Sequence, residues 1–299
     1  MTRTEQHKTL KKIVMDITGR LLQVKNISRL ALSVMLISSV SRAWGADVAA
    51  ELAELAQGEP IIIDVGATYT AGSFSESVAS KTIEKIVSLQ WSAYDIDFLF
   101  TTSYLNRTAP AGSIRTRVNK RVTITPKLVS SSGSGDVFVS ANKEVFTDAA
   151  TAIAINAVLG AKIAAADSAK GLGTGKNDYS LALTASYPFE KALLSGGTKY
   201  TKLGSPGLIQ INGLSENIQL KNVWSGYLSL STEFSEKSTT AITFTVEQPS
   251  VNGTSYYQVT EISSSYRINE LGGVRVYVTK GANQSSPDWS AGVGLFSSF

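Results

Sequence analysis

The sequence predicts an all-β protein, a transmembrane up-and-down antiparallel β-barrel of about twelve strands with both termini in the periplasm. Three observations lead to this prediction. Segments of about ten residues alternate between apolar and small polar side chains, charged residues make up only 17% of the chain, and long and short connections alternate. Successive side chains of a strand point to opposite faces, so one face can meet lipid while the other meets water.

The composition favours a membrane barrel over a soluble protein, in which about 25% of residues are charged. Residues 1–46 hold eight of the 28 basic residues and two of the 24 acidic ones, so the remainder carries 20 basic and 22 acidic side chains. The basic character therefore belongs to the leader, and we expect no nucleic-acid partner. The chain has no cysteine, which excludes a disulfide framework.

The first 46 residues are expected to be an N-terminal extension and a secretory signal peptide. Basic residues precede the apolar run 30–40, which is too short to span about 30 Å of hydrocarbon. Cleavage after Ala43, Ala46 or Ala50 fits the small residues that follow, and Met15 is an alternative start. We expect residues 47–59 to form a short periplasmic connector and 60–299 the barrel, in the outer membrane of a Gram-negative bacterium.

The first four predicted strands cover residues 61–70, 86–94, 96–104 and 136–145. Apolar side chains such as Val65, Trp91 and Phe98 recur at every second position and are expected to face lipid. Asp64 and Asp97 have the opposite parity, so we expect them in the lumen.

The next four predicted strands cover residues 151–165, 178–187, 191–203 and 223–234. The alanine-rich segment 151–165 could form a helix, but evenly spaced isoleucines favour a strand that points Lys162 inward. Segment 178–187 alternates most regularly, with Tyr179 and Tyr187 at the two ends of its apolar face, as in the aromatic girdles of membrane barrels. Glu233 is expected to point into the lumen.

The last four predicted strands cover residues 239–248, 254–267, 272–280 and 289–299. Glu247 and Arg275 fall on the lumenal side, whereas the irregular segment 254–267 gives no clear faces. The final segment has an apolar face and a small polar face, made of Trp289, Ala291, Val293, Leu295 and Phe299 against Ser290, Gly292, Gly294 and Ser298. We expect the C-terminal strand, ending at Phe299, to be the signal read by the barrel assembly machinery.

The connections provide a second test of this topology. Short turns are predicted near Asp95 and at 146–150, 188–190, 235–238 and 268–271, all on the periplasmic side. Long outer links are predicted at 71–85, 105–135, 166–177 and 204–222, with shorter ones at 249–253 and 281–287. Such long-short alternation is typical of outer-membrane barrels. The alternative, a soluble β-sandwich or jelly roll, should carry charges on its solvent face.

Two loop motifs of the chain are similar to motifs of a known family. They are Lys170-Gly-Leu-Gly-Thr-Gly-Lys-Asn-Asp-Tyr179 and Lys280-Gly-Ala-Asn-Gln-Ser-Ser-Pro-Asp-Trp289. Together with the patch 92–110, they resemble the outer-membrane family called MetA-pathway of phenol degradation. The resemblance implies a transporter-like barrel that passes hydrophobic or small organic compounds, without catalytic residues. The glycine-rich motif lacks the spacing of a phosphate-binding loop. We expect Asp178 and Asp288 to hydrogen-bond their loops to the rim, beside Tyr179 and Trp289.

Six charged residues are expected to line the lumen: Asp64, Asp97, Lys162, Glu233, Glu247 and Arg275. They could form a salt-bridge network that braces the barrel, or they could set the selectivity of a pore. Because acids outnumber bases by four to two, an open pore should mildly prefer cations.

Three functions are compatible with this sequence. The first is passive passage of small solutes, hydrophobic or aromatic ones included. The second is a structural or surface-interaction barrel whose lumen is plugged, for example by the 105–135 loop. The third, a hydrolase, is disfavoured because the single histidine, His7, lies in the leader and would be removed. We therefore expect no enzyme, no catalytic residue, no cofactor and no metal.

The predicted outer loop at 105–135 is basic and contains no acidic residue. Its side chains include Arg115, Arg117, Lys120 and Arg121. We expect this loop to contact the phosphates of lipopolysaccharide in the surrounding outer-membrane lipid.

Overall fold

The computed structural model describes residues 61–73, 79–118, 121–205, 207–211, 214–218, 220–251 and 253–299. The predicted signal peptide and connector lie outside these residues, so their boundaries stay predictions. Among the described residues, no helix combines the length and the hydropathy needed to cross a membrane.

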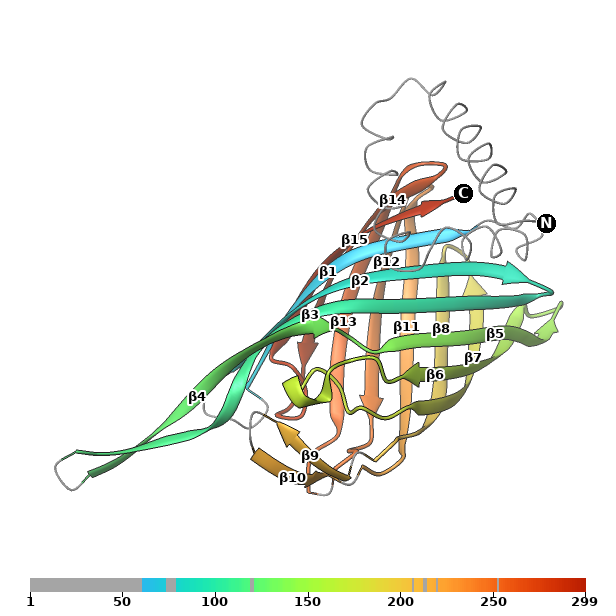
Figure 1. The fold of residues 1–299 in the computed structure, drawn as a ribbon. Helices are drawn as coiled ribbons and strands as arrows, with labels where there is room; N and C mark the ends of the chain where they lie inside the picture. The colour runs from blue at the N-terminus through green and yellow to red at the C-terminus, as the bar shows by residue number, and fades with distance from the viewer. Residues whose placement is uncertain are drawn as a thin grey trace, which may run out of the picture. The chain divides into compact units, whose positions relative to one another are not determined.

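Twelve antiparallel strands close into a barrel (Figure 1). The barrel closes because β1 pairs with β2 on one edge and with β15 on the other. In circular order, the strands are β1 (Ile62–Gly72), β2 (Ser80–Ala93), β3 (Ile96–Val118), β5 (Val137–Asp148), β6 (Ile153–Ile163), β7 (Asp178–Phe189), β8 (Ala192–Lys202), β11 (Val223–Ser235), β12 (Ser238–Glu247), β13 (Tyr257–Asn269), β14 (Gly272–Gly281) and β15 (Trp289–Ser298).

The two ends of the barrel differ as predicted. At one end, the turn end, neighbouring strands are joined by the short connections 94–95, 149–152, 190–191, 236–237 and 270–271. Tyr94 and Asp95 both have positive φ values, 55° and 57°, as a two-residue type I′ hairpin requires. At the other end, the loop end, the connections are longer and include the short helix η1 (Ser168–Lys170).

Contacts across β15 identify the concave face of the sheet. The hydroxyl groups of Thr68 on β1 and Tyr277 on β14 are hydrogen-bonded, although β15 lies between them. Gly292 of β15 is in register with both residues, and the Tyr277 ring lies over it. Side chains two strands apart can meet in this way on the concave side of a curved sheet. Thr68, Tyr277 and the residues in phase with them therefore line the lumen.

The convex face carries the predicted apolar belt. Leu181 and Leu183 of β7 are 53% and 52% exposed, and similar side chains recur on the other strands. The residues that alternate with them on β7, Ser180, Ala182 and Thr184, face the lumen. The barrel prediction is confirmed, and the sandwich alternative is excluded by the closed sheet.

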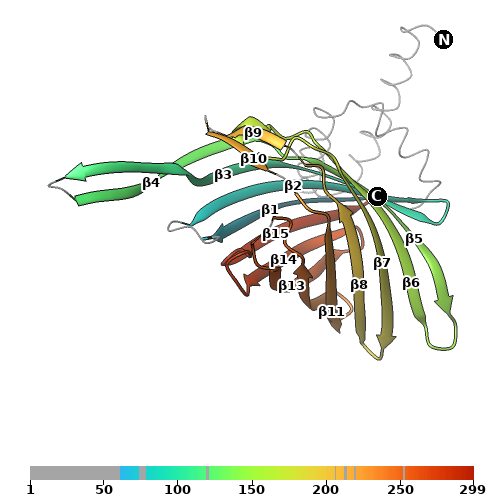
Figure 2. The ribbon, with the colours of Figure 1, turned by 90° about the horizontal axis from the view of Figure 1, so that it is seen from below.

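The prediction of a loop over residues 105–135 is wrong. β3 continues to Val118 and pairs with β4 (Arg121–Ser134), and the resulting hairpin projects from the barrel (Figures 1 and 2). The register shifts between Pro110 and Ser113, where a residue without an N–H group is tolerated. The alternating Val122-Thr123-Ile124-Thr125 run is typical of a strand. It was overlooked because this segment offers no continuous apolar face to lipid.

Two further boundaries differ from the prediction. β2 begins at Ser80 rather than Ile86. Its first residues were missed because their outward positions are Lys81, Ile83 and Lys85 rather than a continuous apolar face. Within the link 204–222, the strands β9 (Gly207–Ile211) and β10 (Leu214–Ile218) form a separate hairpin.

Substitution Gly292→Val should destabilise the barrel, because a Cβ atom there would overlap the ring of Tyr277. Overpacking of this kind costs about 1–3 kcal/mol. We expect the folded, fast-migrating gel band to convert to the unfolded band at a lower temperature than in the unaltered protein. Gly226→Ala is the control, since its Cβ would meet only the Gly197 carbonyl oxygen at 3.4 Å. Equal conversion temperatures for both variants would contradict this prediction.

Candidate pore lumen and its mouth

Three lumenal charges near the turn end, Asp64, Asp97 and Arg275, are paired or hydrogen-bonded. The guanidinium group of Arg275 lies 3.2 Å from the carboxylate of Asp64, across β15. It also lies 5.8 Å from the centre of the Phe296 ring. Asp97 accepts hydrogen bonds from the Ser92 hydroxyl at 2.6 Å and the Asn142 amide at 3.3 Å. These groups brace neighbouring strands.

Glu233 and Glu247 occupy opposite ends of the barrel. Glu233 is exposed near the turn end, beside the register shift between Glu233 and Ser235. Glu247 ends β12 at the loop end, where Ser225 pairs with both Glu247 and Lys199. Lys199 therefore shares the lumenal face with Glu247 and attracts its carboxylate. The six predicted charges thus form separate groups rather than one ring.

Several lumenal charges were not predicted from the sequence, among them Glu84, Lys199 and Glu261. Glu84 lies in register with Thr68, Lys199 lies beside Ser225, and Glu261 accepts a hydrogen bond from Thr279 at 3.3 Å. The first was hidden by the late start predicted for β2, and the other two lie in segments whose faces were not assigned. Alternation around outward Tyr200, whose ring contacts Trp224, could have placed Lys199.

Large apolar and aromatic side chains also face the lumen. Phe138 pairs with Lys162 in register, and Phe296 pairs with Asp64. Tyr227 and Tyr277 lie in phase with other lumenal residues. The lumen is therefore less polar than its charged residues suggest.

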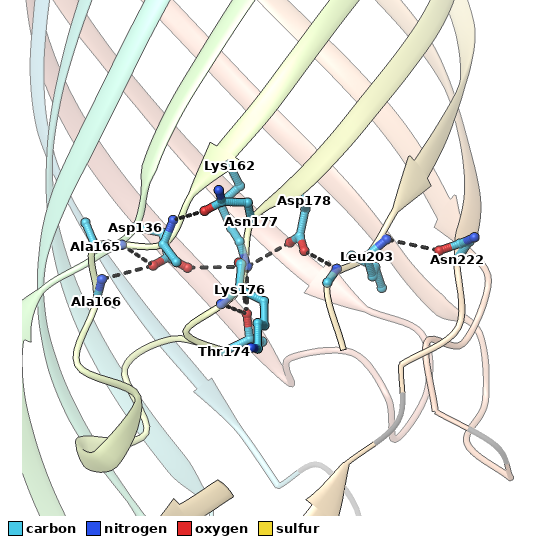
Figure 3. A network of polar contacts seen from close by, with 12 residues as sticks. Asp136, Lys162, Ala165, Ala166, Thr174, Lys176, Asn177, Asp178, Leu203 and Asn222 are labelled. Carbon is cyan, nitrogen blue, oxygen red and sulfur yellow. Dashed lines mark hydrogen bonds and ion pairs between the residues drawn. The ribbon is translucent and has the colours of Figure 1, made fainter. Parts of the chain in front are cut away.

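A buried ion network lies at the loop end, centred on Lys162 of β6 (Figure 3). Its ammonium group lies 2.7 Å from the carboxylate of Asp178 and 3.4 Å from that of Asp136. The side chains of Lys162, Asp178 and Asp136 are only 12%, 12% and 8% exposed. One lysine thus joins the ends of β5, β6 and β7.

The same three charges hold the connection of residues 164–177, which we call the mouth loop. Lys162 donates a hydrogen bond to the Thr174 hydroxyl at 3.0 Å (Figure 3). Asp136 accepts from the backbone N–H groups of Ala165 and Ala166 at 3.1 and 3.0 Å. Asp178 accepts at 2.8 Å from the backbone N–H of Gly204, in the next connection. The network therefore fixes two loop-end connections at once.

The tip of the mouth loop contacts β3 and β4. Arg107 of β3 donates a hydrogen bond to the Gly171 carbonyl at 2.8 Å, and Gly171 has φ of 68°. The buried side chain of Leu172 lies beside Gly133. A hollow of about 240 Å³ separates this tip from the β1–β3 wall, lined by Thr70, Ser80, Thr82, Leu105, Arg107, Gly171 and Leu172. The loop therefore crosses part of the barrel mouth.

Buried side chains concentrate at this end of the barrel. Among the described hydrophobic and polar residues that are buried, Ala93 alone lies at the turn end. β9 lies beside η1, and Ser286 in the link 282–288 accepts a hydrogen bond from the N–H of Gln258. The mouth is therefore narrowed by the mouth loop.

The expectation that the 105–135 segment plugs the lumen is wrong, because its hairpin points away from the barrel (Figure 2).

The remaining site predictions fall on the rim and the hairpin. Asp288 accepts a hydrogen bond from Ser73 at 3.5 Å, while Tyr179 and Trp289 are exposed on the convex face. Arg115 and Arg117 belong to β3 and Arg121 begins β4, whereas Lys120 lies outside the described residues.

No family model and no curated protein matches the chain. Solved structures of outer-membrane barrels do match it. An outer membrane channel from Pseudomonas putida F1 has a TM-score of 0.59 and 11% identity over 81% of this chain and 96% of its own. The NanC porin has a TM-score of 0.51 and 11% identity over 78% and 98%. The translocator domain of the autotransporter NalP from Neisseria meningitidis has a TM-score of 0.50 and 12% identity over 88% and 98%.

These similarities define the class of the protein by its fold. The chain is a closed, antiparallel, twelve-stranded barrel of the outer-membrane type, with one additional strand beside β3. Two of the structures named above are a channel and a porin. The narrower resemblance to the phenol-degradation family stays a prediction.

Substitution Lys162→Met should loosen the mouth loop, because it leaves Asp136 and Asp178 buried without their counter-charge. Breaking a buried ion pair on one side costs about 3–5 kcal/mol. We expect trypsin to cut after Lys170 and Lys176, both in the loop, at least about tenfold faster than in the unaltered protein. Mass spectrometry of the fragments would measure this rate.

Two comparisons make this test specific to the ion network. Lys143→Met removes an exposed lysine on β5 and should leave the cutting rate unchanged. The triple variant D136N/K162M/D178N removes every charge of the network, so it should loosen the loop less than K162M does. Equal rates for K162M and the unaltered protein would show that the network does not hold the loop.

Proposed function

We propose that the protein is an outer-membrane channel for passive passage of small solutes, with the turn end in the periplasm. The observation that supports this best is the closed barrel whose convex face is apolar and whose concave face carries hydroxyl groups, charges and aromatic rings. Polar and charged groups are stable on the concave face only when the lumen holds water that solvates them. The similarity in fold to a channel and a porin supports the same proposal.

Aromatic pairs on the convex face support the membrane placement. Tyr69 contacts Trp289, and Tyr200 contacts Trp224, both near the loop end. Trp91 stacks on Phe98, and Tyr187 stacks on Phe189, both near the turn end. Two such belts separated by aliphatic side chains match the two interfaces of a bilayer.

The lining of the lumen supports a proposal for the solute. Acidic groups outnumber basic ones on the concave face, so we propose a mild preference for cations. Phe138, Tyr227, Tyr277 and Phe296 offer apolar contacts to small hydrophobic or aromatic solutes. We propose no catalytic activity, since no histidine is present outside the leader.

The alternative is a plugged barrel with a structural or surface role. The mouth loop favours it, because its anchoring groups are nearly buried and its tip is hydrogen-bonded to Arg107 of β3. The two functions differ in whether the anchored loop leaves a path for ions.

Planar-bilayer recordings of refolded protein would separate these functions. We expect small conductance steps from the unaltered protein and larger steps from K162M, because the released mouth loop widens the opening. In a salt gradient, the reversal potential should lie on the cation side. A barrel that stays silent in both forms would support the plugged alternative, and anion selectivity would contradict the proposed lining.

We also propose that the basic β3–β4 hairpin contacts lipopolysaccharide phosphates and that the C-terminal strand, ending at Phe299, engages the assembly machinery. Neutralising Arg115, Arg117, Lys120 and Arg121 together should reduce the lipopolysaccharide that co-purifies with the protein, as measured by phosphate assay. Charge-preserving Arg/Lys exchanges are the control. An unchanged amount would count against the hairpin as a contact site.

A further inference from the structure

Two lysines lie on the lipid-facing side of β2, where the sequence predicted no strand. Lys81 and Lys85 are both exposed, and they have the same parity as exposed Ile83 and as Trp91. Trp91 stacks on Phe98 on the convex face, so both lysines belong to that face. Glu84, next to Lys85 in the chain, points into the lumen and offers no local counter-charge on the convex side.

The two lysines flank the aromatic belt near the loop end. Ile83, midway between them, is directly opposite Tyr69, whose ring lies 5.1 Å from that of Trp289. Lys85 is directly opposite Tyr104, which is also exposed. The ammonium groups therefore lie at the level where lipid headgroups begin, in the membrane placement proposed above.

The surroundings leave both ammonium groups accessible. On β1, the side chains directly opposite Lys81 and Lys85 are Ala71 and Ala67, which are too small to cover them. Among the described residues, neither lysine has a carboxylate within 4.0 Å. An unpaired ammonium on the lipid face is tolerated close to the interface, where its long stem lets it reach headgroup charge.

We propose that Lys81 and Lys85 form a binding site for the phosphorylated headgroup of an outer-leaflet glycolipid. Four residues of strand separate their Cα atoms by about 13 Å, which suits two phosphates carried by one disaccharide headgroup. Tyr69 and Tyr104 lie beside them and can contact the sugar or the upper acyl chains. The site rests on the proposed membrane placement and does not require an open pore.

Binding of defined lipids to the refolded full-length barrel in detergent tests this site by native mass spectrometry. The probes are diphosphorylated lipid A, its monophosphorylated form, phosphatidylglycerol and inorganic phosphate. For K81Q/K85Q we expect about tenfold weaker binding of diphosphorylated lipid A, since each basic residue at a membrane surface contributes a severalfold gain. K81R/K85R should retain binding, and the monophosphorylated lipid should be less sensitive to the substitutions.

The matched control is Lys143→Gln, which removes an exposed convex-face lysine from β5. It should bind diphosphorylated lipid A as the unaltered protein does. Unchanged binding in K81Q/K85Q would overturn the proposal, as would an equal loss in K143Q. Displacement of the lipid by millimolar inorganic phosphate would identify a free-ion site instead and would also overturn it.

Two readouts keep this result separate from the proposed channel function. The conversion temperature of the folded gel band shows whether K81Q/K85Q is still a barrel. Conductance of the same variant should equal that of the unaltered protein, because neither side chain faces the lumen. Lipid binding without conductance would remove the channel proposal and leave the lipid site standing.

Discussion

Closure of the sheet between β1 and β15 is the constraint on which the other features depend. In hydrocarbon, each backbone N–H and C=O group must find its partner within the protein, and a closed sheet has no unpaired edge. Ten consecutive register pairs join β1 to β15, from Ile62–Ser298 to Ala71–Trp289. Closure also creates the concave face, where side chains two strands apart converge. The small residues Gly292 and Gly294 of β15 make room there for the Tyr277–Thr68 and Arg275–Asp64 contacts.

The distribution of burial follows from this constraint and runs opposite to that of a soluble domain. The convex aliphatic side chains gain their stabilisation from lipid, so they are exposed in the isolated chain. Close packing is needed only where connections fold over the mouth. There, the desolvation of Lys162 is compensated by two carboxylates, and each carboxylate also accepts backbone N–H groups. This buried polar network therefore lies where lumen and loops meet.

Much of this fold was predictable, because alternation reports directly on the two solvents of a barrel wall. Each of the twelve barrel strands overlaps a predicted segment, and Asp64, Lys162 and Arg275 lie on the concave face. Pairing between charges was not predictable, because it depends on register between strands. The β3–β4 hairpin and residues 80–85 of β2 were missed for a common reason: neither segment presents a continuous apolar face.

The mouth loop bears on both candidate functions, because they differ in whether the anchored loop leaves a path for ions. Its sequence is rich in glycine, yet its ends and its tip are held by Asp136, Lys162, Arg107 and Asp178. Flexibility conferred by glycine in the unfolded chain is compatible with a single fixed conformation when enough hydrogen bonds define it. Gly171, with φ of 68°, adopts the left-handed conformation that turns the tip toward Arg107. The glycines therefore shape the path of the loop, and the ion network holds its ends to β5, β6 and β7.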